Sequence, residues 1–405
     1  MSPRPSSSLE PFRSRHVCVV TETYPPEVNG VALSLARLVD GLRARAHRVS
    51  IVRPRQPGGD GAVDGAGPDV ALVRGFPLPG YRGLQFGVSP WGCLAARWKR
   101  DRPDVVYVAT EGPLGWSAVR TGRRLSIPVL SGFHTNFHTY VRHYRARWLT
   151  PLVLRYLRRL HNDTWSTLVA TDDLRLQLHG LGFERLAVLG RGVDGELFRP
   201  DRRSEALRRS WGVGPDDLVV AHVGRLAPEK NVGLVIRAYR AMVREGAPVR
   251  RLVLVGDGPL RSALERAHPD VRFCGLQLGQ DLAAHYASAD LFLFPSETET
   301  FGNVTLEAMA SGLAIVAYDY AAARMHITPG LNGAVVPCGR PEAFVAVAVS
   351  LGRRPDTLRE MGRHARARAV LLDWAGVIGR FEKLLAEAAV SGRQPWLRPR
   401  RLGVA

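Results

Sequence analysis

The stretch Ser296–Asp319, SETETFGNVTLEAMASGLAIVAYD, lies between two short apolar runs, 291–294 and 314–317. Strands that are buried on both faces of a parallel sheet read as short continuous apolar runs, and both runs fit that pattern. Residues 304–309 between them have a helical character. The order is therefore strand, polar loop, helix and strand. In such a unit the loop lies at the carboxyl end of the first strand, where open α/β sheets bind ligands.

The polar loop of this unit carries two acids, Glu297 and Glu299, followed by Gly302 at the start of the helix. Glycine would let the backbone approach a ligand closely, and the free amides of the first helical turn would face an anion. Glu307 follows Glu299 by about two helical turns, so both carboxylates can face one cleft. The alternative is that these acids only begin a helix and face water, as most charged side chains do.

The length and composition of the chain predict a two-domain globular protein. A chain of 405 residues is too long for one ordinary core. An apolar content of 45% and a charged content of 23% are typical of soluble globular proteins, and no apolar run is long enough to span a membrane. Residues 1–15 are predicted to be a disordered lead, and residues 391–405 a disordered basic tail. The four cysteines are scattered without zinc-ligand spacing, so no metal site is expected.

The formal net charge of +19 favours polyanionic partners such as nucleic acid, an anionic membrane surface or phosphorylated small molecules. The larger share of the excess lies in the first half of the chain. The sequence has no nucleic-acid-binding module and no basic stripe interleaved with aromatic residues, which argues against nucleic acid as a partner.

The strand and helix rhythm predicts two Rossmann-like α/β domains, residues 16–200 and 201–375, followed by a terminal helix, residues 376–390. Strands are expected in the first domain at 16–22, 49–54, 70–76, 104–110, 128–131, 168–171 and 187–189. In the second domain they are expected at 218–224, 252–256, 271–275, 291–295, 314–318 and 334–337.

Two loops in the first half lie where a ligand would bind. Gly30 ends the loop after the first strand and precedes a predicted helix, which is the usual phosphate position in a nucleotide-binding domain, although an ordinary turn would look the same. The loop lacks the G-x-G-x-x-G pattern, which disfavours an NAD oxidoreductase. His134 directly follows another strand in a loop that is unusually polar. A lone histidine is more often a packing residue than a ligand.

Residues 141–161 form a basic amphipathic segment in which Pro151 marks a break or a helix start. Such a segment can lie on an anionic membrane surface with its aromatic residues at headgroup level, or it can be a core helix with a solvated basic face. The candidate membrane contacts are Arg142, Arg145, Trp148, Arg155, Arg158 and Arg159.

Three loops of the second half follow neighbouring strands. Arg225 and Lys230 share one loop, and two cations at a sheet edge suit a diphosphate. Asp257 lies in a tight Gly-Asp-Gly-Pro turn after the next strand. Gly275 and Leu276 end a third strand. Three such loops together are more specific than any one of them.

Taken together, the motifs ETYPPEVNG, FHTN, GRGVD, HVGRLAPEKN, GDGP, ASADLFLFPSETETFGNVTLEAMASG and LNGAVVP resemble those of retaining family-4 glycosyltransferases of the GT-B fold. The resemblance covers residues 16–390. It implies two Rossmann-like domains that face each other across a cleft, with the terminal helix crossing back to the first domain. It also implies a nucleotide sugar as co-substrate, retention of anomeric configuration, and no metal or other cofactor.

The resemblance also implies roles for individual residues. The second domain's loop would hold the donor, with Glu299 on sugar hydroxyls and Glu307 on the ribose. Arg225 and Lys230 would neutralise the diphosphate, which Gly30 would also contact. The backbone amides of Gly302, Asn303 and Val304 would hold the sugar or phosphate, and His134 would lie beside the donor hexose. The donor-binding loops would also include Asp257, Gly275 and Leu276. One departure is Arg191, in Gly-Arg-Gly-Val-Asp, where many relatives have Asn-Gly-Val-Asp; it would add charge to the cleft or acceptor side.

The leading hypothesis is transfer of a hexosyl group from a UDP- or GDP-sugar to a membrane lipid such as diacylglycerol, on the inner face of the cytoplasmic membrane. No carboxylate nucleophile is evident, which favours front-face transfer. One alternative is a GDP-mannose-dependent mannosyltransferase that builds a phosphatidylinositol-type lipid, a lipopolysaccharide or a polysaccharide. An alternative of another class is a non-catalytic nucleotide-sugar-binding protein.

Overall fold

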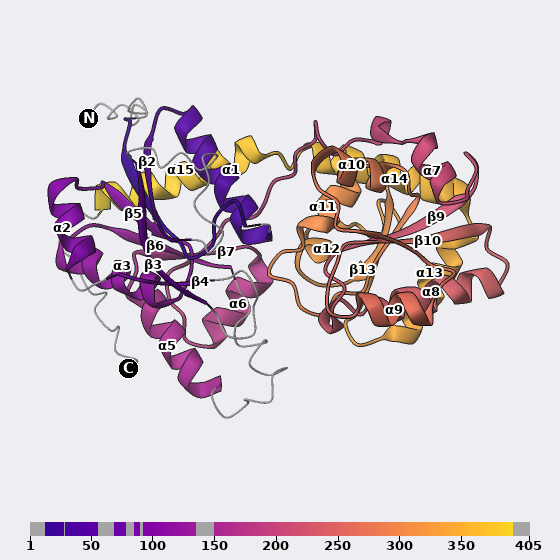
Figure 1. Ribbon diagram of the computed structural model, residues 1–405, viewed down its shortest axis with the longest axis horizontal. Helices are drawn as coiled ribbons and strands as arrows, with labels where there is room; N and C mark the ends of the chain where they lie inside the picture. The colour runs from indigo at the N-terminus through magenta and orange to yellow at the C-terminus, as the bar shows by residue number, and fades with distance from the viewer. Residues whose placement is uncertain are drawn as a thin grey trace, which may run out of the picture.

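The computed structural model describes residues 13–27, 29–55, 69–77, 85–89, 92–134 and 150–391. The chain forms two α/β halves, each built on its own twisted sheet (Figure 1). This confirms the predicted fold class of two Rossmann-like domains.

The first sheet has the strand order β4-β3-β2-β1-β5-β6-β7-β8 among the described residues. Its neighbouring strands are parallel except for β3 and β4, which are antiparallel. The edge strand β4 was not predicted from the sequence. The bounds are β1 His16–Val20, β2 Arg48–Pro54, β3 Val70–Pro77, β4 Gln85–Val88, β5 Val105–Val108, β6 Val129–Phe133, β7 Ser166–Val169 and β8 Leu186–Val188.

Helices cover both faces of the first sheet, and one of them comes from the end of the chain. Helix α15 packs on α1 and buries Ile378, Phe381 and Leu385 in the core of the first half. Figure 1 shows it in yellow beside α1. The helices of this half are α1 Gly30–Ala44, α2 Cys93–Arg100, α3 Pro113–Arg124, α5 Thr150–Asn162, α6 Asp172–Gly180 and α15 Trp374–Ser391.

The second sheet is parallel throughout, with the order β11-β10-β9-β12-β13-β14 in the described part of the chain. Its strands are β9 Leu218–Val223, β10 Val249–Val255, β11 Arg272–Gly275, β12 Leu291–Phe294, β13 Ala314–Tyr318 and β14 Ala334–Val336. The helices around it are α7 Glu205–Ser210, α8 Val232–Arg244, α9 Arg261–Ala267, α10 Gly279–Ala287, α11 Asn303–Ala310, α12 Ala321–His326, α13 Pro341–Gly352 and α14 Pro355–Val370.

The apolar runs of the sequence become the buried strands of this second sheet. Every residue of β12 and β13 is buried, because helices cover both faces. Since β9, β10, β11 and β12 run in the same direction, the loops that follow them meet at one edge of the sheet. That edge is where the sequence placed its donor-binding residues.

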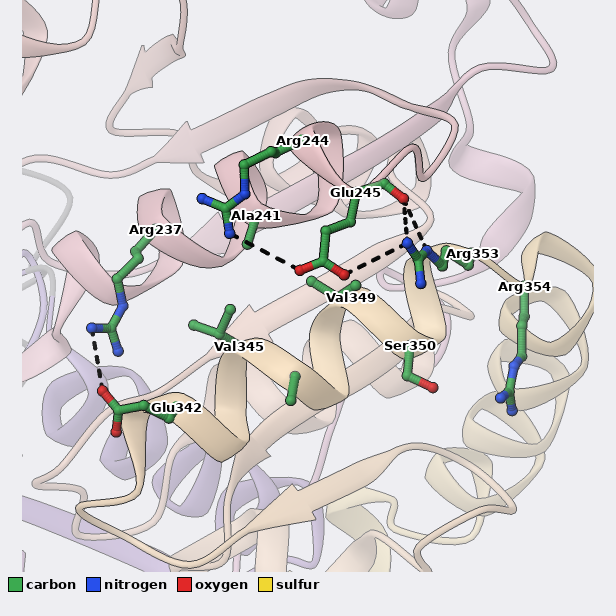
Figure 2. A pocket seen from close by; sticks show the side chains of 11 residues that line it. Arg237, Ala241, Arg244, Glu245, Glu342, Val345, Val349, Ser350, Arg353 and Arg354 are labelled. Carbon is green, nitrogen blue, oxygen red and sulfur yellow. Dashed lines mark hydrogen bonds and ion pairs between the residues drawn. The ribbon is translucent and has the colours of Figure 1, made fainter.

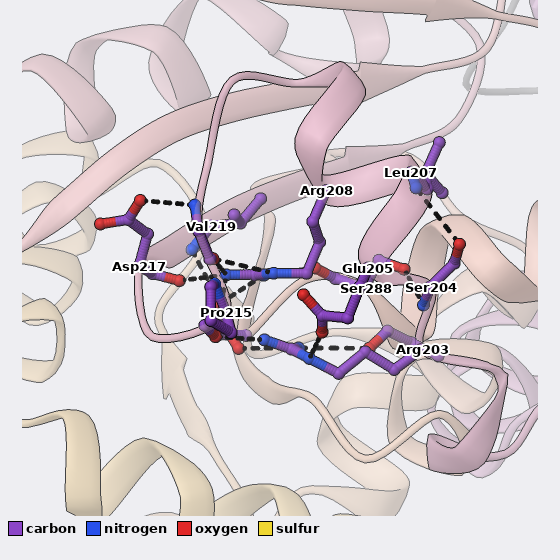
Figure 3. Close-up of polar contacts among 12 residues, drawn as sticks. Arg203, Ser204, Glu205, Leu207, Arg208, Pro215, Asp217, Val219 and Ser288 are labelled. Carbon is purple, nitrogen blue, oxygen red and sulfur yellow. Dashed lines mark hydrogen bonds and ion pairs between the residues drawn. The ribbon is translucent and has the colours of Figure 1, made fainter.

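The chain crosses between the two halves twice, and the two crossing segments pair with each other near Val193 and Asp373. Val193 donates its amide to the carbonyl of Leu372 at 2.8 Å and forms a bridge with Asp373. Beyond this point a fully buried arginine, Arg208 of α7, anchors the start of the second half (Figure 3). Its guanidinium donates to four backbone carbonyls, those of Gly214, Pro215, Asp217 and Ser288.

The predicted basic segment 141–161 is described only in its second part. Helix α5, Thr150–Asn162, has Pro151 at the second of its described residues. Arg142, Arg145 and Trp148 lie outside the described residues, as do most of the predicted disordered lead and tail.

Candidate functional site

An ion pair between Lys230 and Glu299 lies at the edge of the second sheet. The Lys230 ammonium contacts Oε1 of Glu299, and the hydroxyl of Ser296 donates to the same oxygen at 2.7 Å. The Lys230 nitrogen also lies 5.7 Å from the ring centroid of Phe294, the last residue of β12. Both charged groups are largely shielded from solvent. The structure therefore brings together a cation and an acceptor that the sequence had assigned to the diphosphate and to the sugar.

Helix α11 begins directly beside this ion pair, and no side chain caps it. Its N-cap residue, Gly302, has φ 91°, a left-handed conformation that disfavours any residue with a side chain. The amides of Asn303 and Val304 precede the first amide bonded within this turn, that of Thr305. Unbonded amides at a helix N-terminus, together with the helix dipole, attract an anion.

Glu307, one turn further along α11, is partly buried and accepts a hydrogen bond from the Tyr286 hydroxyl at 2.9 Å. Burial raises the pKa of Glu307 to about 7, while the bond from Tyr286 acts in the opposite direction. A carboxylate in this position can exchange a proton for hydrogen bonds from the hydroxyl groups of a ligand.

Arg225 follows β9 and is exposed, and the described residues place no carboxylate within ion-pairing distance of it. Backbone hydrogen bonds connect the loops after β9, β10 and β11. The amide of Leu226 donates to the carbonyl of Asp257 at 2.9 Å, and the amide of Gly256 donates to the carbonyl of Gly275 at 2.8 Å. A Cβ on Gly256 would lie 2.0 Å from the carbonyl oxygen of Gly224, so only glycine permits this approach.

Arg261, which was not predicted as a site residue, contacts two of the predicted donor-binding loops, those of Asp257 and Gly275. The Asp257 carboxylate accepts from the Gly258 amide at 2.7 Å and from Arg261 Nη1 at 3.2 Å. The guanidinium of Arg261 also lies 3.1 Å from the position that a Cβ on Gly275 would take. Leu276 next to it is 59% exposed. An exposed apolar side chain beside a guanidinium suits the face and the edge of a nucleotide base.

The two halves of the protein touch at this site. A Cβ on Gly30 would lie 3.7 Å from Nδ2 of Asn303, so the start of α1 faces the start of α11. Unlike α11, helix α1 is capped, because the Asn29 side chain accepts from the amides of Val31 and Ala32 at 3.1 and 2.9 Å. The start of α1 therefore has fewer free amides for an anion than the start of α11.

His134 reaches the site through its backbone. The hydroxyl of Thr300, in the donor loop, donates to the His134 carbonyl at 2.9 Å. The buried ring bonds within the first half, with Nε2 2.7 Å from the Tyr107 hydroxyl and Nδ1 3.0 Å from Nη2 of Arg191. Burial and the charge of Arg191 hold the pKa of His134 well below its ordinary value.

Helix α5 presents the described part of the predicted membrane segment, away from this cluster of residues. Arg155, Arg158 and Arg159 are exposed and line a hollow of about 270 Å³ with Asn162 and Asp163. Leu152 of the same helix is 61% exposed. Tyr156 stacks on Trp116 of α3 with ring centroids 5.2 Å apart.

A second hollow, of about 560 Å³, lies between α8 and α13 (Figure 2). Arginine and glutamate side chains pair across it, as Arg237 does with Glu342 and Arg353 with Glu245. None of the predicted site residues lines this hollow.

Several residues that shape the site were not singled out from the sequence: Tyr107, Arg261, Tyr286, Ser296 and Thr300. Each makes its contact with a site residue through a hydrogen bond or close approach that depends on the fold. Ser296 and Thr300 lie within the motif loop itself, so their position near Glu299 was the one available signal.

Comparisons with known proteins agree with this geometry. A family model described as glycosyl transferases group 1 matches residues 217–353, and one described as glycosyltransferase family 4 matches residues 28–197. The chain is 34% identical to a GDP-mannose-dependent alpha-mannosyltransferase of Mycobacterium tuberculosis, over 90% of this chain and 92% of that protein. It is 28% identical to an alpha-monoglucosyldiacylglycerol synthase of Streptococcus pneumoniae, over 74% and 70% of the two chains.

Among solved structures, the fold is similar to that of a sucrose-phosphate synthase from Thermosynechococcus elongatus, with a TM-score of 0.74. That likeness covers 93% of this chain and 100% of the other, at 18% identity, and it supports the two-domain GT-B architecture.

Proposed function

Because the chain belongs to the group 1 and family 4 glycosyltransferases and is a nucleotide-sugar glycosyltransferase, we propose that it transfers a mannosyl group from GDP-mannose to a membrane-lipid acceptor. The donor is proposed from the GDP-mannose-dependent alpha-mannosyltransferase, with which the similarity extends over nearly the whole length of both chains. A non-catalytic role is not favoured, because the matched families and relatives are transferases.

The single observation that carries the proposal is the ion pair of Lys230 with Glu299 beside the uncapped start of α11. Lys230 and the amides of α11, together with the exposed Arg225 from the same loop as Lys230, would take up the negative charge that develops on a departing diphosphate. Protein cations and amides would then supply the stabilisation that a metal ion supplies in other transferases. We therefore infer a reaction that does not need a metal.

Glu299 is the acceptor for the hydroxyl groups of the donor sugar in this proposal. Its carboxylate is held by Lys230 and Ser296. Donor binding would move the ammonium toward the diphosphate and free the carboxylate for the sugar.

We infer that transfer retains the α-configuration of the donor. A front-face reaction, in which the acceptor attacks on the side that the diphosphate leaves, needs no covalent intermediate. The product anomer can be read from the anomeric coupling in an NMR spectrum. A β-linked product, or a glycosyl-enzyme adduct found by mass spectrometry, would contradict this mechanism.

The lipid part of the proposal is supported by helix α5 and by the relative that acts on diacylglycerol. Three exposed arginines line one hollow next to the exposed Leu152, an arrangement that suits anionic headgroups. Within the described residues, no helix has the length and hydropathy needed to cross a bilayer. We propose that contact with the inner face of the cytoplasmic membrane is peripheral and made through α5.

Transfer of glucose from UDP-glucose to diacylglycerol is the second candidate, because a relative of that activity matches 74% of the chain. A donor screen separates the two candidates. Turnover of GDP-mannose, UDP-glucose, UDP-galactose and UDP-glucuronate is measured with diacylglycerol or phosphatidylinositol-type acceptors, with and without EDTA. The proposal expects GDP-mannose to be preferred and EDTA to have no effect. A UDP-sugar as the only donor used would refute the mannosyl assignment.

Membrane contact is tested with vesicles that contain anionic lipid, at low and high salt. Replacing Arg155, Arg158 and Arg159 with Gln should weaken vesicle binding by roughly 3 kcal/mol, since each basic residue near such a surface contributes about 1 kcal/mol. The matched control replaces the three exposed arginines of α8, at positions 237, 240 and 244, with Gln. Equal weakening by both triple variants would show a general charge effect and would refute a role for α5.

A further inference from the structure

The ring of His134 is held between two side chains of the first half. Its Nδ1 lies 3.0 Å from Nη2 of Arg191, and its Nε2 lies 2.7 Å from the hydroxyl of Tyr107. All three side chains are buried, with Arg191 7%, His134 8% and Tyr107 0% exposed. The ring therefore has no free nitrogen with which to bind a ligand or to exchange a proton.

The chemistry of these partners fixes the position of the proton on the ring. A guanidinium has five N–H donors and no acceptor, so Nδ1 of His134 must be the acceptor. The ring is then neutral with its proton on Nε2, and Nε2 donates to the oxygen of Tyr107. A proton on Nδ1 would point at another N–H group and break the contact with Arg191.

Arg191 is unusual because it is a buried cation that forms no ion pair with any residue that the structure describes. No carboxylate among the described residues lies within ion-pairing distance of it. The charged or titratable groups around His134 are Arg191 itself, Tyr107 and His161. Burying a guanidinium without a counter-charge is costly, so its retention beside His134 points to a role there.

We propose that Arg191 is a positioning residue that locks His134 as a neutral ring protonated on Nε2, so that the backbone of His134 is presented to the donor loop. This inference rests on the proposed function, since it concerns the same site. The locked ring leaves the His134 carbonyl as the group that faces the second half, where it accepts from Thr300. His134 then orients the loop that carries Glu299 and takes no part in proton transfer.

The fold supports this role for the ring. Tyr107 lies on β5 and packs edge-on against Phe381 of the C-terminal helix, with ring centroids 4.9 Å apart. Arg191 lies two residues before Val193, at the crossover between the halves. The ring of His134 is therefore clamped between a rigid strand and the crossover segment, and its backbone extends from this clamp to Thr300.

The state of the ring can be measured without any substrate. Long-range ¹H–¹⁵N spectra of protein labelled on histidine report which ring nitrogen carries the proton, and the His134 signals are assigned by their loss in His134→Gln. We expect the Nε2–H form with no titration between pH 5 and pH 8. In Arg191→Gln we expect the proton to exchange between the two ring nitrogens and the pKa of His134 to rise, but to stay below its ordinary value because the ring remains buried. Arg191→Lys keeps a cationic donor and should keep the Nε2–H form.

Kinetics give a second readout on whichever donor the wild-type enzyme uses. Arg191→Gln should lower kcat by about tenfold or more while the donor KM changes little, since small misplacements of a site are costly. Arg191→Lys should restore part of the lost kcat. The matched control is Arg120→Gln, which removes one exposed arginine from α3 and should change neither value.

Two results would overturn the inference: an Nδ1–H ring in the wild-type protein, or a wild-type His134 that titrates near its ordinary pKa. Equal loss of melting temperature and activity in the Gln and Lys variants would also overturn it, since that pattern indicates a structural role alone. The spectra do not depend on the donor or acceptor. An error in the proposed substrates would therefore leave this test intact.

Discussion

Nucleotide-sugar binding should depend on pH through a single side chain, Glu307. Burial raises the pKa of this carboxyl group to about 7, so about half of the unliganded protein carries a proton there at pH 7. Ribose hydroxyl groups donate hydrogen bonds, and an ionised carboxylate is a stronger acceptor than a protonated one. Donor binding should therefore favour the ionised form and release a proton.

The size of the effect follows from linkage between the two equilibria. If the bound donor returns the pKa of Glu307 to its ordinary value of 4.5, affinity is limited by the ionised fraction of the free protein. That fraction falls about tenfold between pH 8 and pH 6, which equals about 1.4 kcal/mol. About half a proton should be released per donor bound at pH 7, and nearly one at pH 6.

Isothermal titration calorimetry in two buffers of different ionisation enthalpy measures both the affinity and the protons released. The ligand should be the nucleotide sugar, because both of its phosphates are esterified and do not titrate in this range. Glu307→Gln should bind with an affinity that no longer changes through this group. Tyr286→Phe removes the hydrogen bond that lowers the pKa of Glu307, so its pH dependence should move to higher pH.

Glu22 provides the background for this experiment, because burial raises its pKa to about 7 as well. It lies in the first half and is unchanged in the Glu307 variant.

The effect of pH on the stability of the native state has the opposite sign to its effect on donor binding. An acid whose pKa is raised by folding binds a proton more tightly in the native state, so native stability falls as pH rises from about 4.5 through about 7. Glu307→Gln should thus gain melting temperature at pH 8 and little at pH 5. An affinity that stays constant from pH 6 to pH 8 in the wild type, or equal pH dependence in Glu307→Gln, would refute this account.

Three further outcomes are expected. Lys230→Ala and Glu299→Ala should each lower turnover about 10²-fold or more, as loss of a preorganised charge-stabilising group does, and near-normal rates in both would remove the site assignment. Arg208→Met removes the buried guanidinium that donates to four backbone carbonyls and should cost roughly 3 kcal/mol of unfolding free energy in urea titrations, with little change in donor KM. Gly30→Ala should leave the melting temperature unchanged, because the added Cβ would lie at an ordinary contact distance of 3.7 Å from Asn303. The same methyl group should raise the donor KM by crowding the diphosphate. An unchanged KM would show that the diphosphate lies elsewhere.

Local sequence patterns were sufficient for most of the fold. The buried strands of both sheets are short apolar runs, and the structure places β9 and β12 within a residue or two of their predicted bounds. The antiparallel edge strand β4, residues 85–88, could not be predicted in the same way. Its residues are only partly buried for the most part, and its pairing with β3 is a long-range contact that periodicity does not report.

The site followed from sequence only where a motif encoded it locally. Glu299, Gly302 and Glu307 lie in one loop and helix, so their spacing alone predicted that the two carboxylates could face one cleft. Tyr286 and Tyr107 lie on other elements and reach their partners through tertiary packing. The departure at Arg191 was visible as an unusual residue in a known motif, but its contact with His134 spans 57 residues and needed the fold.

The two helix N-termini that the sequence offered as anion sites show what local reasoning cannot decide. Both α1 and α11 begin after a strand at a glycine or next to one, and both face the point where the halves meet. Asn29 turns its side chain back onto the amides of α1, whereas the left-handed Gly302 has no side chain to do so for α11. Because an anion needs unsatisfied donors, we propose that the second half would hold the charge of the diphosphate and that the first half would limit the space around it.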